Sequence, residues 1–414
     1  MVTINKYQAL FGFITFLIIQ FSIFELHFGI YVLTSFICFS TISKNVINLI
    51  SYIIILLIIA GISSIFQKPT LYDFIKDFAY FTKPIIALIA GYLLAKKIAD
   101  FSSFLRTFIY VVCLLSVFHI FNIFLNVDFS QASVTKIRTI GGISNLSEVI
   151  ALTIIIASYR IQFLDVIKNK LLKKVILSII FLSFFLYFSR TMFVSLGLFL
   201  LAIFGYLKIT SKGLKYGFLA LSAFLLFYVY LFNANLERDK PGLESFLYKL
   251  KIAPSEIFTP IRTVDPNNHA YLWDHWRAYE ATLAIDQINT PVTFLIGKGL
   301  GALVDLKFKV YLGDSEMRYI PMLHNGFVLV FFKTGIIGFF IYLLFLINMY
   351  LFAYAKITSE KTRIINNLIS GFGVYFIFSS LIISGIYNIE DFYMFIVGTL
   401  LFFRKEAKIN LIEE

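Results

Sequence analysis

Three polar positions of this 414-residue chain lie next to long apolar segments. Arg190 separates two very apolar runs, Arg277 follows Trp276 in an aromatic-rich stretch, and His324 precedes Asn325 at the start of another apolar run. A guanidinium group presents a planar fork of donors that matches the oxygens of a phosphate. An imidazole exchanges a proton near neutral pH and can serve as a general base. Such residues at a membrane boundary would suit an anionic substrate carried on a lipid.

Each of these positions also has a purely structural interpretation. Arg190 can anchor a short turn by extending its charge to the lipid headgroups, an interpretation we weight equally with phosphate binding. Arg277 can lie on a solvated helix face with Glu280 as its i, i+3 partner, which is the more frequent situation for a helical arginine. Asn325 can cap a helix, with His324 incidental.

The composition predicts an integral membrane protein. The chain is 59% hydrophobic and only 14% charged, with a mean hydropathy of +0.85. A soluble domain would be roughly a quarter charged. The 49 phenylalanines and 24 tyrosines suit lipid-facing helices with aromatic belts at the membrane interfaces.

The net charge of +12 does not indicate nucleic-acid binding, because many basic residues lie in short loops rather than on one folded face. Two cysteines, Cys38 and Cys113, lie within apolar runs, so no disulfide framework is predicted. There is no Walker A motif, and the histidines lack the spacing and the carboxylates of a metal site. We therefore expect no nucleic-acid partner, no cofactor and no metal.

Apolar runs that could cross a bilayer recur along the whole chain. A membrane-spanning helix needs roughly 20 apolar residues. Lys83, Glu148 and Lys333 are polar exceptions within these runs, too scattered to form a transport relay. The first run predicts a retained helix rather than a cleaved signal peptide. The sequence predicts about twelve spans, with ten or eleven as the alternative: 7–24, 27–42, 46–66, 79–97, 104–126, 143–160, 174–189, 191–208, 214–232, 323–350, 366–386 and 390–404.

The distribution of lysine and arginine predicts the orientation in the membrane. If the N-terminus is cytoplasmic and all twelve spans are real, 19 basic residues lie in cytoplasmic segments. The short outer connections then hold only five, namely Lys68, Lys76, Lys136, Arg138 and Arg190. Because cytoplasmic loops carry the excess of positive charge, both termini are expected in the cytoplasm and the longest loop outside.

That loop, residues 233–322, is about 90 residues long and is too long for a simple connector. An i, i+3, i+4, i+7 apolar pattern over 243–250 predicts a short amphipathic helix at the membrane surface. With residues 1–232 as spans 1–9, and 323–414 as spans 10–12 and a cytoplasmic tail, it forms one integrated all-α domain.

A second loop helix is expected to begin after the cap pair Asn267-Asn268 and to run to about Ile288. Pro291 is expected to end it, and the glycines of 297–301 to form a flexible return to the membrane. The apolar stripe of this helix consists of Leu272, Trp276, Tyr279 and Leu283.

Ser189-Arg190-Thr191 at the start of an apolar run resembles the Ser-Arg signature of O-antigen polymerases and O-antigen ligases. The outer loop, with Arg277 some twenty residues before Gly297-Lys-Gly299, is similar to that superfamily as well. So is His324-Asn325 followed by Gly335 and Gly338. The resemblance covers about residues 180–350, and the first half of the chain matches only in hydropathy.

The resemblance implies a GT-C-like membrane glycosyltransferase with a polyprenyl-diphosphate-linked donor and no nucleotide sugar or essential metal. Arg190 and Arg277 would neutralise the diphosphate and stabilise the charge that builds on it as the glycosidic bond breaks. His324 would accept the proton of the acceptor hydroxyl or orient that hydroxyl. Arg318, Asn325 and Trp276 would contribute to substrate binding.

One position departs from the family pattern. Family members commonly have an aromatic residue one turn after the loop arginine, whereas this chain has Ala281 there, and its tryptophans precede Arg277. Arg262 and Arg318 are therefore the alternatives for the loop arginine.

The resemblance leads us to expect polymerisation of undecaprenyl-diphosphate-linked oligosaccharide repeat units into O-antigen or capsular polysaccharide. The reaction would take place at the outer face of the bacterial cytoplasmic membrane, with a chain-length regulator as a candidate partner. The first alternative is an O-antigen ligase, which moves the finished polymer to lipid A–core. The second is a polysaccharide flippase or other transporter, which would need a charged cavity and repeat symmetry.

Overall fold

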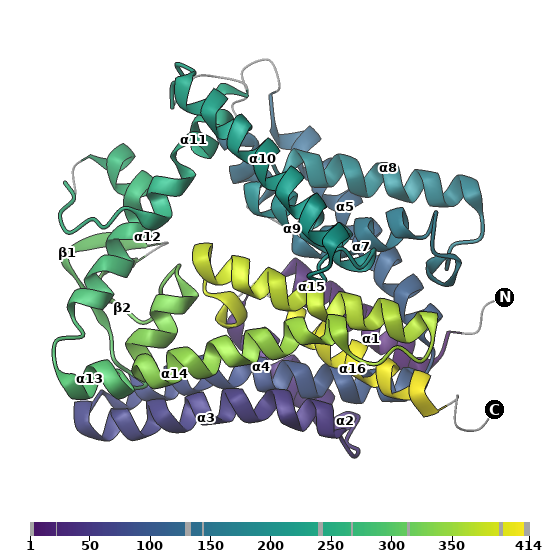
Figure 1. Cartoon of the computed structure of the whole chain (residues 1–414), viewed down its shortest axis with the longest axis horizontal. Helices are drawn as coiled ribbons and strands as arrows, with labels where there is room; N and C mark the ends of the chain where they lie inside the picture. The colour runs from purple at the N-terminus through teal and green to yellow at the C-terminus, as the bar shows by residue number, and fades with distance from the viewer. Residues whose placement is uncertain are drawn as a thin grey trace.

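The computed structural model describes residues 4–21, 23–128, 134–142, 145–238, 243–265, 268–312, 315–388 and 392–409, and most of them are helical (Figure 1). The first helices are α1 (Lys6–Gln20), α2 (Phe24–Ile37), α3 (Lys44–Gln67), α4 (Leu71–Ile98), α5 (Phe101–Asn126), α6 (Val134–Gly141) and α7 (Leu146–Ala157). Then follow α8 (Lys170–Leu186), α9 (Arg190–Ile203), α10 (Ser211–Asn233), α11 (Glu244–Phe258), α12 (His269–Asp286) and α13 (Pro291–Ile296). The strands β1 (Val304–Leu312) and β2 (Ser315–Ile320) precede α14 (Gly326–Tyr350), α15 (Glu360–Ile382) and α16 (Tyr393–Ile409).

Six helices of the described residues are long and apolar enough to cross a membrane, namely α3, α4, α5, α10, α14 and α15. Helices α1, α2, α7 and α9 are apolar as well, but shorter. The chain is therefore a helical membrane protein whose apolar helices associate with a lipid bilayer. Each of the twelve apolar runs found in the sequence contains one helix. Length and composition support a membrane span for the six longest apolar ones.

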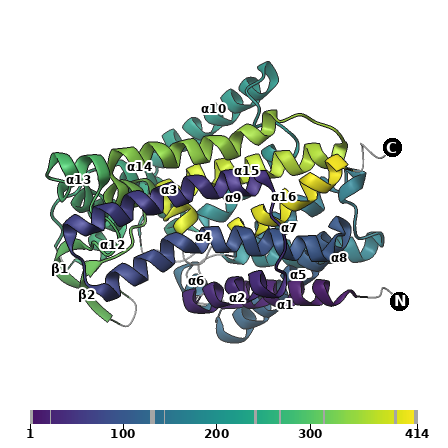
Figure 2. The same cartoon turned by 90° about the horizontal axis from the view of Figure 1, so that it is seen from below.

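The long helices run side by side, and the loop elements gather at one end of them. Helices α12 and α13 and both strands lie at the end of the bundle opposite to the two marked chain ends (Figures 1 and 2). Helix α4 packs along α16, and α3 packs along α14. A Cβ atom on Gly91 would lie 1.9 Å from the carbonyl oxygen of Phe395, so α4 and α16 approach closely because glycine has no side chain.

The loop contains a β-hairpin, which an all-α fold does not include. Strand β1 pairs with β2 in antiparallel register. The stretch Val304–Leu312 alternates apolar and polar residues, and Val304, Leu306 and Val310 are buried. Such period-two alternation is typical of a strand with one buried face, so the sequence carried this signal.

Pro291 begins a helix instead of ending one. Helix α12 already ends at Asp286, and Thr290 caps the N-terminus of α13, with Pro291 in its first turn. Proline suits this position because the first turn of a helix leaves its N–H groups without helical partners.

The glycine-rich segment after α13 is a fixed turn rather than a flexible return. Gly297, Gly299 and Gly301 have φ angles of 74°, 82° and 79°, a conformation that side chains disfavour. A Cβ atom on Gly299 would lie 2.4 Å from the backbone nitrogen of Ser64 in α3. Gly299 N–H also donates to the carbonyl of Lys333 in α14 at 2.9 Å. The turn therefore lies against both helices.

A buried ion pair holds this turn between α4 and α14. The Lys333 ammonium group pairs with the Asp77 carboxylate, and their side chains are 0% and 1% exposed. Asp77 also accepts a hydrogen bond from Gly301 N–H at 2.6 Å, and Lys333 donates to the carbonyl of Ala302 at 2.6 Å. Lys333, one of the scattered polar residues within the apolar runs, thus anchors the long loop of residues 233–322 to the bundle.

Removing one partner of this pair should destabilise the fold strongly. Lys333→Met leaves the Asp77 carboxylate buried without its counter-charge, which costs about 3–5 kcal/mol. The double variant Asp77→Asn/Lys333→Met should recover most of that loss, because asparagine is uncharged and can still accept from Gly301. Thermal unfolding of the detergent-solubilised protein measures both effects.

The matched control is Arg363→Met, which breaks the exposed Arg363–Glu360 pair. Its effect should stay below about 1 kcal/mol. Equal losses in Lys333→Met and Arg363→Met would contradict the anchoring role.

Candidate functional site

Helix α12 positions the charged residues of the long loop, residues 233–322. Asn268 caps it, since its side chain accepts from Tyr271 N–H. The predicted apolar stripe is confirmed, because all four of its residues are buried: Leu272, Trp276, Tyr279 and Leu283. With that stripe fixed, Asp274, Arg277 and Glu280 follow at intervals of three residues and line up along the helix.

The first of these residues joins α12 to α11. Asp274 is buried, pairs with the Lys249 ammonium group of α11, and lies 3.3 Å from Arg238 Nε. These contacts hold the two helices side by side. The same helix α11 carries Glu256 near its C-terminal end.

Glu256 brings two predicted site residues together. Its Oε2 atom lies 3.2 Å from Arg190 Nη2 and 2.9 Å from Arg277 Nη1, and its side chain is 6% exposed. Arg190 also donates to the carbonyl of Lys249. One carboxylate oxygen therefore connects the first residue of α9 with the middle of α12. The two arginines are 87 positions apart in the sequence.

Arg138 of α6 adds a third guanidinium group. Burial, and then the positive charges of Arg190 and Arg277, lower the pKa of Arg138, while Glu256 opposes that shift. The buried Nε atoms of Arg138 and Arg277 have no hydrogen-bond partner. We call Arg138, Arg190, Arg277 and Glu256 the arginine cluster. Two guanidinium groups share one carboxylate, and the nearby charge of Arg138 adds to them. The excess of positive charge and the unused donors are the chemistry of an anion site.

His324 contacts Glu280, the last of the three charged residues that line up along α12. Its Nδ1 atom is 2.9 Å from Glu280 Oε1, and the same carboxylate accepts from the His324 backbone N–H. Glu280, the expected partner of Arg277, is thus bound to His324, while Arg277 pairs with Glu256. Because an ionised carboxylate only accepts, Nδ1 carries the proton and Nε2 is left as an acceptor. The His324 side chain is 49% exposed, so a substrate can reach it.

Two other loop arginines lie apart from the cluster. Arg318, predicted to bind substrate, pairs with Asp305 within the β-hairpin, and Arg262 pairs with Asp286. Hydrogen bonds from Arg318 lower the pKa of Asp305 to about 2. Both arginines are largely exposed and have their own carboxylate. Of the three candidates for the loop arginine, the structure brings Arg277 to Arg190.

Asn325 and Trp276 have structural contacts. Asn325 caps α14, because its Oδ1 atom accepts from Val328 N–H at 3.0 Å. Trp276 is 5% exposed and packs in the core near Trp273 and Tyr279. Neither side chain is part of the arginine cluster.

Sequence reasoning missed Arg138 and Glu256. Arg138 entered the sequence analysis only as one of five basic residues in short outer connections, where such residues are scarce. The rarity of basic residues in these connections could therefore have pointed to Arg138. Glu256 follows Pro254 within α11 and shows no pattern of its own.

No protein-family model matches this chain, and no curated protein and no solved structure matches it. Its function therefore has to be inferred from the chemistry of these side chains. Arg277, which pairs with Glu256, and Glu280, which binds the His324 imidazole, lie one helical turn apart on α12.

The arginine cluster should bind a polyvalent anion more readily once Glu256 loses its charge. Glu256→Gln should destabilise the protein in anion-free buffer by about 1–3 kcal/mol. This is less than for a fully buried pair, because Arg190 and Arg277 are 22% and 36% exposed. Sodium pyrophosphate should raise the melting temperature of Glu256→Gln more than that of the wild type.

Asp305→Asn is the matched control, since it also removes the carboxylate partner of an arginine. Pyrophosphate should not stabilise Asp305→Asn beyond the wild type. If pyrophosphate shifts Glu256→Gln and Asp305→Asn equally, the cluster is not a specific anion site.

Proposed function

We propose that this protein polymerises polyprenyl-diphosphate-linked oligosaccharide repeat units at the outer face of the bacterial cytoplasmic membrane. The observation that carries the proposal is the convergence of Arg190 and Arg277 on Glu256, next to the His324–Glu280 pair, with the charge of Arg138 nearby. Arg277 and Glu280, which contact the two groups, lie one turn apart on α12, and this proximity supports a diphosphate site next to a proton acceptor. The resemblance of residues 180–350 to O-antigen polymerases and ligases supports the same reaction.

The arginine cluster binds the donor diphosphate. Glu256 occupies the space between Arg190 and Arg277 when no substrate is bound. A diphosphate carries more negative charge than one carboxylate and can accept paired hydrogen bonds from each guanidinium group. It therefore replaces Glu256 as the partner of at least one arginine. The guanidinium groups also stabilise the negative charge that the diphosphate gains as it leaves.

His324 takes the proton from the acceptor. The acceptor hydroxyl oxygen bonds to the anomeric carbon while the bond between that carbon and the diphosphate oxygen breaks. The electron pair of that bond stays on the diphosphate, and the hydroxyl proton moves to His324 Nε2. Glu280 holds the ring in the tautomer that this transfer needs and stabilises the resulting imidazolium.

The proposed orientation places α12 and the hairpin outside and both termini in the cytoplasm. The charge asymmetry of the short loops supports it. So does the separation of α12 from the chain ends along the bundle (Figure 2). In this arrangement the shorter apolar helices also cross or enter the bilayer, in a GT-C-like fold with about twelve spans. The arginine cluster then lies close to the outer leaflet, within reach of a lipid-linked diphosphate.

Substitution of the site residues should abolish polymerisation. Arg190→Ala, Arg277→Ala and His324→Ala should each eliminate long-chain polysaccharide, because loss of one charge-stabilising donor typically slows a reaction about 10²–10³-fold. Gel electrophoresis of the lipopolysaccharide or capsule measures chain length. Arg262→Ala is the control, since Arg262 is exposed on the same loop and lies outside the cluster. Normal chain length in all three site variants would refute the assignment.

Deletion of the gene separates polymerase from ligase activity. Loss of a polymerase leaves a single repeat unit on the lipid A–core. Loss of a ligase leaves bare core and accumulates lipid-linked polymer. The second result would assign the same site chemistry to a ligase.

Labelling of single cysteines tests the orientation. In a variant with Cys38 and Cys113 replaced by alanine, a membrane-impermeant maleimide should label Glu316→Cys in intact spheroplasts. It should label Lys356→Cys only after lysis. Glu316 is exposed in the hairpin, and Lys356 is exposed at the opposite end of α14. Labelling of Lys356→Cys before lysis would reverse the orientation.

A further inference from the structure

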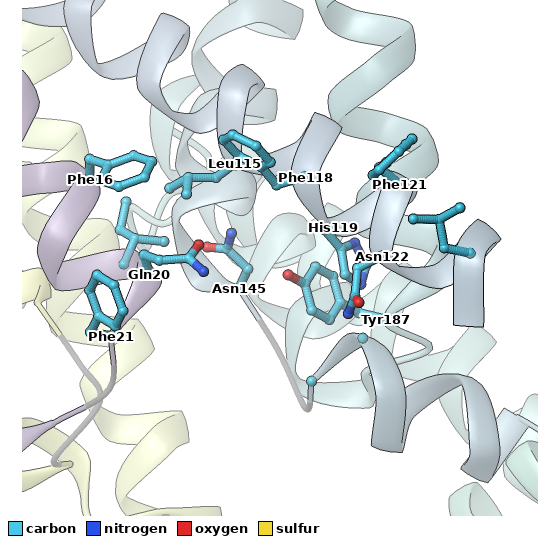
Figure 3. A pocket seen from close by; sticks show the side chains of 14 residues that line it. Phe16, Gln20, Phe21, Leu115, Phe118, His119, Phe121, Asn122, Asn145 and Tyr187 are labelled. Carbon is cyan, nitrogen blue, oxygen red and sulfur yellow. The ribbon is translucent and has the colours of Figure 1, made fainter. Parts of the chain in front are cut away.

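A second polar site lies beside the arginine cluster. A cavity of about 870 Å³ opens between the ends of α1 and α5 and is lined by both amide and aromatic side chains (Figure 3). Its polar lining comes from Gln20, His119, Asn122, Asn145 and Tyr187. The Gln20 amide points toward Asn145 across the cavity (Figure 3). So many polar groups are unusual where apolar helices meet, since each needs a hydrogen-bond partner.

A buried network fixes the wall of the cavity. The hydroxyls of Ser116 and Ser183 both donate to Glu148 Oε1, at 2.7 and 2.6 Å. His119 Nδ1 is 2.7 Å from Ser183 Oγ, whose one proton is already given to Glu148. Nδ1 is therefore the donor, and Nε2 is left as an acceptor. The ring is further held by stacking on Tyr187, with centroids 3.7 Å apart.

One polar atom of this wall lacks a partner. His119 is 7% exposed, and its buried Nε2 atom has no hydrogen-bond partner. Nε2 lies beside Gly141, which itself lines the cavity, and a Cβ atom there would be 2.5 Å from it. Leaving a buried acceptor unpaired costs about 1–3 kcal/mol, so a ligand hydroxyl that reaches this wall is favoured.

Two separate chain segments each carry one residue of the cavity and one residue of the arginine cluster. Gly141 lines the cavity, and Arg138 lies one helical turn earlier on α6. Tyr187 lines it as well, and Arg190 follows three residues later. Three residues span at most about 10 Å, so a group attached directly to a diphosphate held by the cluster can reach the cavity.

The lining favours a sugar over a hydrocarbon chain. Amide groups donate and accept, as sugar hydroxyls do. The electron-rich faces of Phe16, Phe118 and Phe121, which also line the cavity, attract the C–H groups of a sugar ring. An isoprenoid chain would bury the amides and the imidazole without partners.

We infer that this cavity binds the saccharide that is attached to the donor diphosphate. The inference rests on the proposed function and extends it. The arginine cluster holds the diphosphate, and the amides and aromatic rings of the cavity select the sugar next to it. Recognition of the repeat unit would then be located in the first half of the chain, away from the outer loop.

Equilibrium binding of two lipids to the full-length protein in nanodiscs tests this assignment. One probe is the lipid-linked oligosaccharide extracted from a strain lacking this gene, and the other is undecaprenyl diphosphate without sugar. Gln20→Leu and His119→Phe should weaken binding of the sugar-bearing lipid about 3–10-fold, the effect of one lost hydrogen bond. Binding of undecaprenyl diphosphate should change less than twofold. His119→Phe keeps a ring on Tyr187, and Gln20 is exposed, so its variant preserves the fold.

Two further variants separate the outcomes. Arg138→Gln should weaken both lipids, and Gln67→Leu, an exposed amide at the end of α3, should weaken neither. If both lipids bind but the cavity variants affect them equally or not at all, the sugar assignment is overturned and the proposed function stands. If neither lipid binds to the wild type, the proposed function fails and the sugar assignment fails with it.

Discussion

The attraction between the Glu256 carboxylate and the guanidinium groups of Arg190 and Arg277 connects three helices, α9, α11 and α12. Arg138 extends the cluster to α6. The positive charges of neighbouring arginines repel one another, so the arginines can share a half-buried space only with an anion between them. In this structure the anion is the carboxylate of Glu256. In the proposed function a diphosphate takes that place, because it carries more negative charge than one carboxylate.

A second ion pair fixes the position of the loop relative to α4 and α14. Asp77 and Lys333 are fully buried and hold the glycine turn between α4 and α14. Lys333 lies on the same helix that His324 precedes, so the anchor also limits where His324 can move relative to Glu280. The long loop is therefore an integral part of the bundle. Its charged side chains are positioned by helices that are themselves anchored by buried charges.

Local patterns predicted the elements of the site well. The stripe of α12 was readable because its apolar residues recur with the helical period, and this placed Arg277 on a different face. The cap at Asn325 followed from the residue type. The hairpin was not predicted, although apolar and polar residues alternate regularly along Val304–Leu312.

Contacts between segments far apart in the chain could not be predicted from local sequence patterns. Glu280 has the i, i+3 spacing for an ion pair with Arg277, yet its carboxylate binds His324. In a packed helix, side chains contact neighbouring elements as well as residues of the same helix. From the sequence alone Arg138 was assigned to a loop, whereas in the structure α6 packs against α5, α8 and α11. Glu256 carried no recognisable pattern, and its role exists only in the assembled site.

The sequence by itself determined that this protein resides in a membrane, that its long apolar runs are helical, and which polar residues border those runs. These properties depend on composition and on spacing along the chain, which folding does not change. The tertiary structure decided which arginines meet, which carboxylates they meet, and that a polar cavity lies beside them. Those outcomes depend on burial and on distances between segments far apart in the chain, where the energy of each charge is set by its neighbours in space.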